Sequence, residues 1–273
     1  MTLSDAHCHL QDTRLAVTDA ALHTVLDECR HAGICRWMVN ATKESDWASV
    51  LDLSRRELGV QAAIGLHPWW QKERSSHWES ELMAHLQANP EVTIGETGLD
   101  RWMAGHDLLD QLKVLKVHLL LSQKMDRPIS LHCLRAWPEL FSAVRQTRPS
   151  KKGFLLHSYT GPPELLAGWI ELGAFFSFSP AFLHPRKSMV RAAFGSIPLE
   201  RLLIETDAPD MGPPSEMMLA RLEPNSETGN PTNHPGNLKL CLKALAADRH
   251  MAEENLAAIL EENWTQLFER ADA

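Results

Sequence analysis

The sequence predicts a closed (β/α)8 barrel of the TIM type, formed by a single domain that spans residues 1–273. Eight short apolar segments alternate with longer helical patterns, which is the order of elements in this fold. Polar residues of the kinds that bind metals follow one apolar segment after another. The chain length also suits one large barrel. A doubly wound open sheet is the structural alternative, because local patterns do not show whether a sheet closes.

Strands are expected where short apolar segments occur between turn residues. They are Leu3–His7, Arg36–Asn40, Val60–Leu66, Val92–Gly95, Pro128–Leu131, Gly153–Leu156, Ala174–Ser177 and Arg201–Ile204. Helices are expected between them at Val17–Ala32, Glu44–Leu58, His77–Gln87, Leu108–Lys124, Pro138–Thr147, Pro163–Leu172 and Arg186–Phe194. Asp19 near the start of the first helix and Gly33 after its end are typical caps.

Two further segments follow the eighth strand. The segment Ala208–Asn237 is rich in proline and glycine and is predicted to be a long loop. In a barrel such a loop lies at the rim where active sites are built, although plain surface irregularity is the alternative. The segment Glu253–Arg270 is predicted to be an amphipathic helix that packs on the barrel wall.

Charge and cysteine content narrow the function classes. The formal net charge of -8 argues against a long DNA-binding surface, which is usually basic, but not against cutting at a strand end. Five cysteines without a CxxC pair indicate reduced thiols. The N-terminus lacks a signal pattern, and no apolar run approaches the ~20 residues of a membrane span. We therefore expect a cytoplasmic protein with no membrane association, and nothing in the sequence indicates an obligate protein partner.

The strongest local signal is Asp5-Ala6-His7-Cys8-His9. Alternate residues of a strand point to the same face, so His7 and His9 face together and Cys8 faces away. Two imidazoles on one side can bind a divalent ion, although an isolated HxH pattern is equally well explained by two polar residues in a turn.

Similar residues recur at the carboxyl ends of later strands. These residues are His67, Glu96, Asp100, His132, His157, Glu205 and Asp207. Barrel enzymes build their sites from this rim, so the set predicts a metal site. His67 is expected to contact the substrate or to act as a cap, and Glu205 to hydrogen-bond from outside the ligand set. Asp100 and Gln111 could orient other side chains, or Asp100 could cap a helix.

Six motifs resemble those of the TatD family of metal-dependent deoxyribonucleases. They are DAHCHL, GLHP, GETGLD, LHC, HSYTG and ETDAPDM, in the order of the family, followed by a similar Asn263-to-Phe268 tail. The resemblance implies two divalent metal ions. One would be held by His7, His9, Glu96 and Asp207, and the other by Glu96, His132 and His157, with Glu96 bridging.

Two departures from the family pattern concern arginines. Leu134 stands where the family usually has Arg, with Arg135 next to it, and Thr232-Asn233-His234-Pro235 replaces Arg-Asn-x-Pro. Arg101 and Arg135 are the candidate residues for binding a phosphate. Trp69 and Trp70 could stack on a base, although core packing is the more common role of tryptophan.

The resemblance implies a deoxyribonuclease that acts on DNA, on single strands or strand ends. Two divalent ions would activate a water, and Asp207 and Glu96 would be the catalytic carboxylates, with Asp207 as general base. Imidazoles suit zinc, whereas carboxylates suit magnesium or manganese, so the metal stays open. The alternatives are an ester hydrolase acting on aminoacyl-tRNA and a metal-binding protein without turnover. Polarity, exo or endo action and oligomeric state stay open.

Overall fold

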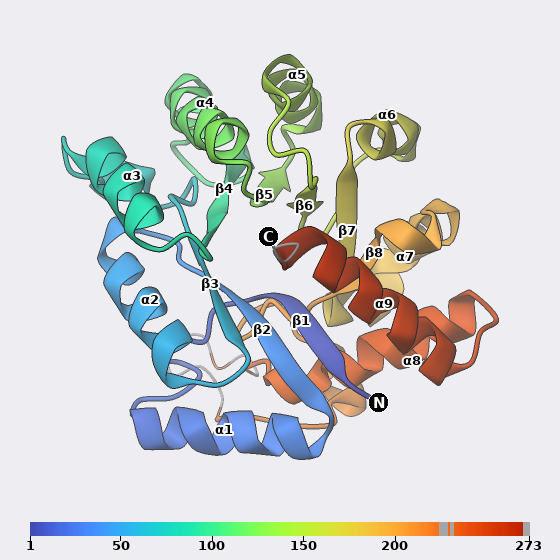
Figure 1. The fold of residues 1–273 in the computed structure, drawn as a ribbon. Coiled ribbons are helices and arrows are strands. Elements are labelled where there is room, and N and C mark those ends of the chain that lie inside the picture. Colours follow the sequence, from blue (N-terminus) through green and yellow to red (C-terminus); the bar gives the residue numbers. More distant parts are fainter. Residues whose placement is uncertain (224–228, 230–231, 270–273) are drawn as a thin grey trace. The chain divides into compact units, whose positions relative to one another are not determined.

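The computed structural model describes residues 1–223, 229 and 232–269. Its eight strands form one sheet in which the strand order follows the chain, as Figure 1 labels them. The strands are β1 (Leu3–Cys8), β2 (Ile34–Asn40), β3 (Val60–Ile64), β4 (Thr93–Asp100), β5 (Ile129–Leu134), β6 (Phe154–Leu156), β7 (Ala174–Phe178) and β8 (Leu202–Ile204).

Helices follow the strands along the chain, and Figure 1 shows α4 and α5 outside β4 and β5. They are α1 (Asp19–His31), α2 (Trp47–Arg56), α3 (Trp78–Ala88), α4 (Leu108–Met125), α5 (Trp137–Thr147), α6 (Leu166–Glu171), α7 (Ser188–Ala193), α8 (Leu238–Asp248) and α9 (Glu253–Phe268). Helix α8 begins directly after the proline-rich loop and was not predicted from the sequence. None of the helices in the described ranges is long and apolar enough to span a bilayer.

The first and last strands lie next to each other. The backbone N–H of Asp207 donates to the carbonyl of His7 at 2.8 Å, and the N–H of His9 donates to the carbonyl of Ala208 at 2.8 Å. A doubly wound sheet keeps its first strand in the interior and reverses the strand order from there. The chain-order sheet and the pairing of its ends therefore confirm the (β/α)8 barrel and exclude the open sheet.

The chain divides into two compact units. The first unit consists of Met1–Val39, Arg55–Gln61 and Ser177–Trp264. The second unit consists of Asn40–Ser54, Ala62–Phe176 and residues 265–269. Each has its own buried aromatic core, with Trp37 and Phe178 in the first and Trp47 and Trp169 in the second. Burial of each large apolar side chain contributes about 1.5–3 kcal/mol. The assignment of residues 1–273 to a single domain stays a prediction.

Strands β4 and β5 extend further than the sequence predicted. After a register shift between Ile94 and Thr97, the two strands stay paired, with Gly98 opposite His132. Gly98 has a φ of +154°, and a Cβ at this position would lie 1.9 Å from the carbonyl oxygen of His132. Glycine thus permits an approach of the two backbones that no other residue allows. As a result, Glu96 and His132 lie within strands rather than just beyond them.

The predicted loop Ala208–Asn237 contains two short 3-10 turns, Ser215–Met217 and Pro235–Asn237. Residues 224–228 and 230–231 of this loop lie outside the described residues, as does Arg270 at the end of the predicted C-terminal helix. Asn233 Nδ2–H donates to the carbonyl of Thr206 at 2.9 Å. The Thr232–Pro235 segment, which differs from the family pattern, is therefore hydrogen-bonded to the residues directly after β8.

Candidate metal centre

In the first unit, His7, His9 and Asp207 come together as a cluster that we call the first cluster. Asp207 Oδ1 lies 3.2 Å from His9 Nε2 and 3.6 Å from His7 Nε2. The two imidazole rings are edge to face, with centroids 5.0 Å apart. One ligand atom from each residue lies within 4.8 Å of the others. Residues 198 or more positions apart along the chain thus converge because β1 and β8 are neighbours.

Buried hydrogen bonds hold the first cluster in place. Asp5 of β1 accepts hydrogen bonds from the Oγ1–H and, at 2.9 Å, from the backbone N–H of Thr206. Burial raises the pKa of Asp5 to about 8, even though these hydrogen bonds oppose the shift. Asp207 itself has a left-handed backbone, with a φ of 53°. Such a conformation costs a non-glycine residue about 1–2 kcal/mol and is more frequent at functional sites.

In the second unit, Glu96, His132 and His157 form the second cluster. Glu96 Oε1 lies 2.8 Å from His157 Nε2 and 3.1 Å from His132 Nδ1. The two imidazole nitrogens lie 3.2 Å apart. All three residues are buried, at 2–8% exposure. One carboxylate oxygen is thus surrounded by nitrogen atoms that can act as metal ligands.

His67 adjoins the second cluster. Its Nε2 lies 3.5 Å from Glu96 Oε1, and its ring centroid lies 4.4 Å from that of His132. Its Nδ1 accepts the backbone N–H of Trp69 at 3.1 Å, which leaves Nε2 to face the glutamate. His67, Glu96 and His132 offer ligand atoms within 4.8 Å of one another. While Nδ1 accepts the hydrogen bond from Trp69, the ring carries its proton on Nε2, so His67 is placed to donate to Glu96 or to a group bound beside it.

Asp100 determines the orientation of His132. Its Oδ2 accepts from His132 Nε2–H at 3.1 Å and from Trp69 Nε1–H at 2.7 Å, while its Oδ1 accepts the backbone N–H groups of Trp102 and Met103. Because the carboxylate is an acceptor, His132 carries a proton on Nε2, and Nδ1 is the nitrogen that can bind a metal ion once it is unprotonated.

Electrostatics reinforce this pair. Burial disfavours a charge on His132, but its hydrogen bonds to Asp100 and Glu96 outweigh that effect and raise its pKa. Burial also disfavours the charged form of Asp100 and on its own would raise its pKa. The hydrogen bonds from His132 and Trp69 outweigh burial and hold the pKa of Asp100 below its usual value. Gln111 completes the arrangement, because its side chain accepts the N–H of Asp100 at 2.8 Å and donates to the Asp100 carbonyl at 2.9 Å.

The donor sets of both clusters fit a divalent metal ion. Each combines imidazole nitrogens with a carboxylate oxygen, the combination that binds zinc and other first-row divalent metals. In the second cluster the hydrogen bond to Asp100 engages His132 Nε2 and leaves Nδ1 as the nitrogen that can bind a cation. The chemistry of the residues is therefore compatible with the metal binding that the sequence predicts.

The remaining candidate residues differ in their surroundings. Arg101 donates from Nη1 to Glu139 Oε1 at 2.9 Å, so its charge is already paired at the surface. Arg135 is exposed and has a left-handed backbone, with a φ of 57°. Glu205 accepts a hydrogen bond from Ser177 Oγ–H, and its expected place outside the ligand set stays a prediction. The roles of both arginines in phosphate binding stay predictions.

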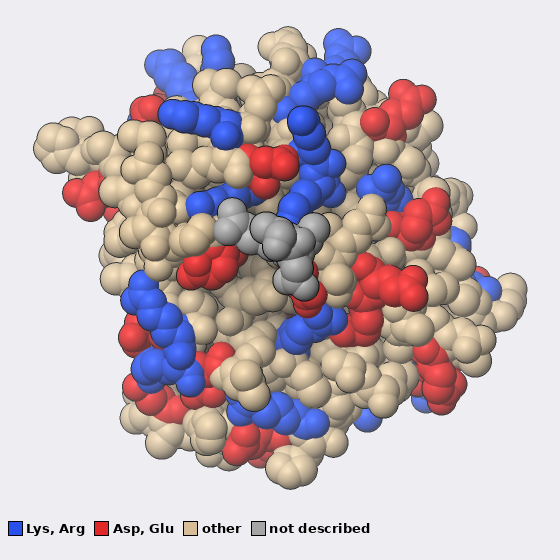
Figure 2. Space-filling model, viewed as in Figure 1, with Lys and Arg blue, Asp and Glu red and all other residues tan. Residues whose placement is uncertain are grey.

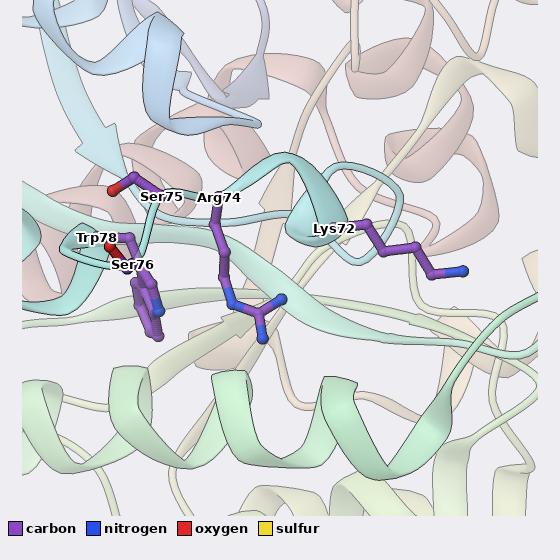
Figure 3. Close-up of a pocket in the computed structure, with 5 residues that line it drawn as sticks. All are labelled: Lys72, Arg74, Ser75, Ser76 and Trp78. Carbon is purple, nitrogen blue, oxygen red and sulfur yellow. The ribbon is translucent and has the colours of Figure 1, made fainter.

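Charges of both signs are interspersed over the face that Figure 2 shows, in keeping with the net charge of -8. A hollow of about 500 Å³ lies over the start of α3, lined by Lys72, Arg74, Ser75, Ser76 and Trp78 (Figure 3). Arg74 is paired there with Asp110 at 2.8 Å, and Lys72 Nζ donates to a backbone carbonyl. This hollow includes none of the residues of the two clusters.

The roles of Asp100 and Trp69 could not be decided from the sequence. Asp100 does not cap a helix, because Asp107 caps α4 instead. The hydrogen bond between Trp69 and Asp100 joins residues 31 positions apart and leaves no local pattern. The only hint was that both residues follow strands that also carry ligand-type side chains.

Comparisons with known proteins agree with these features. A family model described as TatD related DNase matches residues 4–269. The chain is 29% identical over 209 residues to the uncharacterized metal-dependent hydrolase YjjV of Escherichia coli, covering 76% of this chain and 79% of that protein. It is 26% identical over 249 residues to the 3'-5' ssDNA/RNA exonuclease TatD of Edwardsiella piscicida, covering 90% of this chain and 93% of that protein.

Among solved structures, the crystal structure of the TatD homolog YjjV from Escherichia coli is similar to the present one. The TM-score is 0.86 at 26% identity, and the match covers 98% of each chain. The likeness therefore extends over both compact units and all eight strands.

Proposed function

The chain belongs to the family of TatD-related DNases, and on that premise we propose that it is a metal-dependent hydrolase that cleaves phosphodiester bonds in DNA, on single strands or at strand ends. The observation that carries the proposal is the second cluster, in which Glu96 Oε1 faces the ligand nitrogens of His132 and His157. The relative named as a 3'-5' ssDNA/RNA exonuclease supports the choice of nucleic acid as the substrate class.

Two sets of residues would hold the metal ions. His7, His9 and Asp207 would hold one ion, and Glu96, His132 and His157 the other. A divalent ion supplies Lewis-acid stabilisation of phosphate oxygens and lowers the pKa of a water molecule. The further assignment of Glu96 to both ions comes from the family resemblance and stays a prediction. Zinc, magnesium and manganese remain the candidate metals.

Local charge explains how an acidic protein could bind a phosphodiester. Glu96 and Asp207 contribute two negative charges against four positive charges of two divalent ions, which leaves about +2 on simple counting. Arg101 and Arg135 would add contacts to phosphate oxygens, and His67 a hydrogen bond. No broad basic face is then required, in contrast to proteins that bind long stretches of duplex.

Proton transfer and the positioning of the ligands would be carried out by side chains of the protein. Asp207 would accept the proton of the attacking water, because its Oδ1 is the carboxylate oxygen of the first cluster. His9 Nε2, 3.2 Å from this oxygen, restrains its position. Asp100 would keep a proton on His132 Nε2, so that Nδ1 is the nitrogen available to the ion.

The test is a panel of substrates incubated with zinc, magnesium or manganese. Single-stranded DNA, duplex DNA, RNA and aminoacyl-tRNA are each assayed with the native chain and with Asp207→Asn. Metal-dependent DNA cleavage that the variant lacks supports the proposal. Release of an amino acid from aminoacyl-tRNA with DNA left intact would instead identify an ester hydrolase. Full metal occupancy without turnover of any substrate would identify a metal-binding protein.

A further inference from the structure

Trp69 is an exposed aromatic side chain that is nevertheless held in one place. It is 43% exposed, whereas Trp37, Trp47, Trp169 and Trp264 are fully buried. Its Nε1–H donates to Asp100 Oδ2 at 2.7 Å, and its ring packs edge to face against His67 with a centroid distance of 5.3 Å. Core packing therefore does not account for this tryptophan.

The anchor of Trp69 is also the anchor of the second cluster. The same oxygen, Asp100 Oδ2, accepts from His132 Nε2–H at 3.1 Å. His67 packs against Trp69 on one side and against His132 on another, with centroid distances of 5.3 and 4.4 Å. One carboxylate and one imidazole ring thus fix the indole relative to the ligand nitrogens of the second cluster.

The neighbouring Trp70 lacks these features. Lys43 Nζ lies over its ring, 4.8 Å from the centroid, and the side chain is only partly exposed. One face of Trp70 is therefore covered by a side chain of the same unit. Trp70 is therefore a matched control for Trp69, because it is the same residue type at the next position of the chain.

We propose that Trp69 is a stacking platform for a nucleobase of a single-stranded nucleic acid, next to the second cluster. This inference rests on the proposed function and specifies its substrate as one with planar heteroaromatic bases. Stacking on an aromatic side chain is favourable for every base, since each has a π-face, so the subsite would be tolerant of sequence. A platform fixed in advance loses less conformational freedom when the base binds.

The subsite is tested by equilibrium binding, independently of turnover. A fluorescein-labelled single-stranded oligothymidylate and an abasic oligomer, both with phosphorothioate linkages that resist hydrolysis, are titrated into the metal-loaded protein, with fluorescence anisotropy as the readout. Native protein should bind the base-bearing oligomer more tightly. Trp69→Ala should weaken that binding by about 5- to 100-fold and leave the abasic oligomer unaffected. Trp70→Ala should change neither.

Trp69→Phe guards against a folding defect, since it keeps an aromatic ring and should retain most of the preference for bases. The inference is overturned if native protein binds both oligomers equally, or if Trp69→Ala weakens both to the same extent. If Trp69-dependent binding is found but no DNA is cleaved, the subsite stands and the nuclease proposal fails. If Trp69→Ala cleaves base-bearing DNA with unchanged KM, the nuclease stands and the subsite fails.

Discussion

Replacing Asp100 by asparagine should weaken metal binding through His132, although Asp100 itself is not a proposed ligand. The carboxylate accepts four hydrogen bonds, two on each oxygen. Asparagine has one acceptor oxygen and one NH2 group, so it can satisfy only one side. If its NH2 group faces Trp69 and His132, the imidazole must accept at Nε2 and carry its proton on Nδ1, toward Glu96. If it faces the backbone, two N–H groups lose their acceptor.

The size of the loss depends on which of these two orientations the amide adopts. Loss of the partner that orients a ligating histidine typically lowers metal affinity by about 10- to 100-fold, or roughly 1.4–2.7 kcal/mol. The alternative orientation leaves buried donors without acceptors, which costs about 1–3 kcal/mol of folding stability. Asp100→Asn should therefore lose metal affinity, stability or both, whichever orientation the amide adopts.

The assay is competition for zinc against a chelator of known affinity, with unfolding in urea measured alongside. Nitrogen NMR shifts of His132 in the metal-free protein report its tautomer directly. Asp126→Asn is the matched control, because Asp126 accepts hydrogen bonds from Ser150 and Lys151 of the same unit, and neither residue belongs to a cluster. Native zinc affinity and an unchanged Nε2–H tautomer in a folded Asp100→Asn variant would refute the reasoning.

Three further predictions concern catalysis, acid stability and backbone packing. Asp207→Asn should reduce metal-dependent hydrolysis by about 10²- to 10⁴-fold, since the general base is lost. Asp210→Asn, which removes only an exposed pair with an arginine, should retain native rates, and equal rates for both variants would contradict the assignment. Burial lowers the pKa of His118 to about 4, so the unfolded chain, with a pKa near 6.5, binds more protons between these values. Stability should thus fall by up to about 3 kcal/mol from pH 6.5 to pH 4, and urea unfolding should show a smaller fall for His118→Gln. Gly98→Ala should cost about 3 kcal/mol or more, since its Cβ would lie 1.9 Å from a carbonyl oxygen of β5, whereas the unobstructed Gly105→Ala should cost about 1 kcal/mol. Equal unfolding midpoints for these two variants would show that the close approach is not rigid.

Local patterns in the sequence were sufficient for the succession of strands and helices. Apolar runs bounded by turn residues predicted all eight strands, with errors of a few residues at their ends. The largest errors were in β4 and β5, whose pairing resumes after Glu96 and includes His132 because Gly98 lets the backbones approach. Helix α8 was missed because its apolar residues directly follow the proline-rich loop.

The sequence by itself also determined which residue types could form a metal site, because His, Glu and Asp recur at strand ends in the order of a known family. Only the tertiary structure decided what each of them touches. Arg101 pairs with Glu139, and Asp100 engages Nε2 of His132 while it holds Trp69. These choices depend on donors and acceptors 31 or more residues apart. Periodicity reports only which face a residue occupies, so it carries no information about such partners.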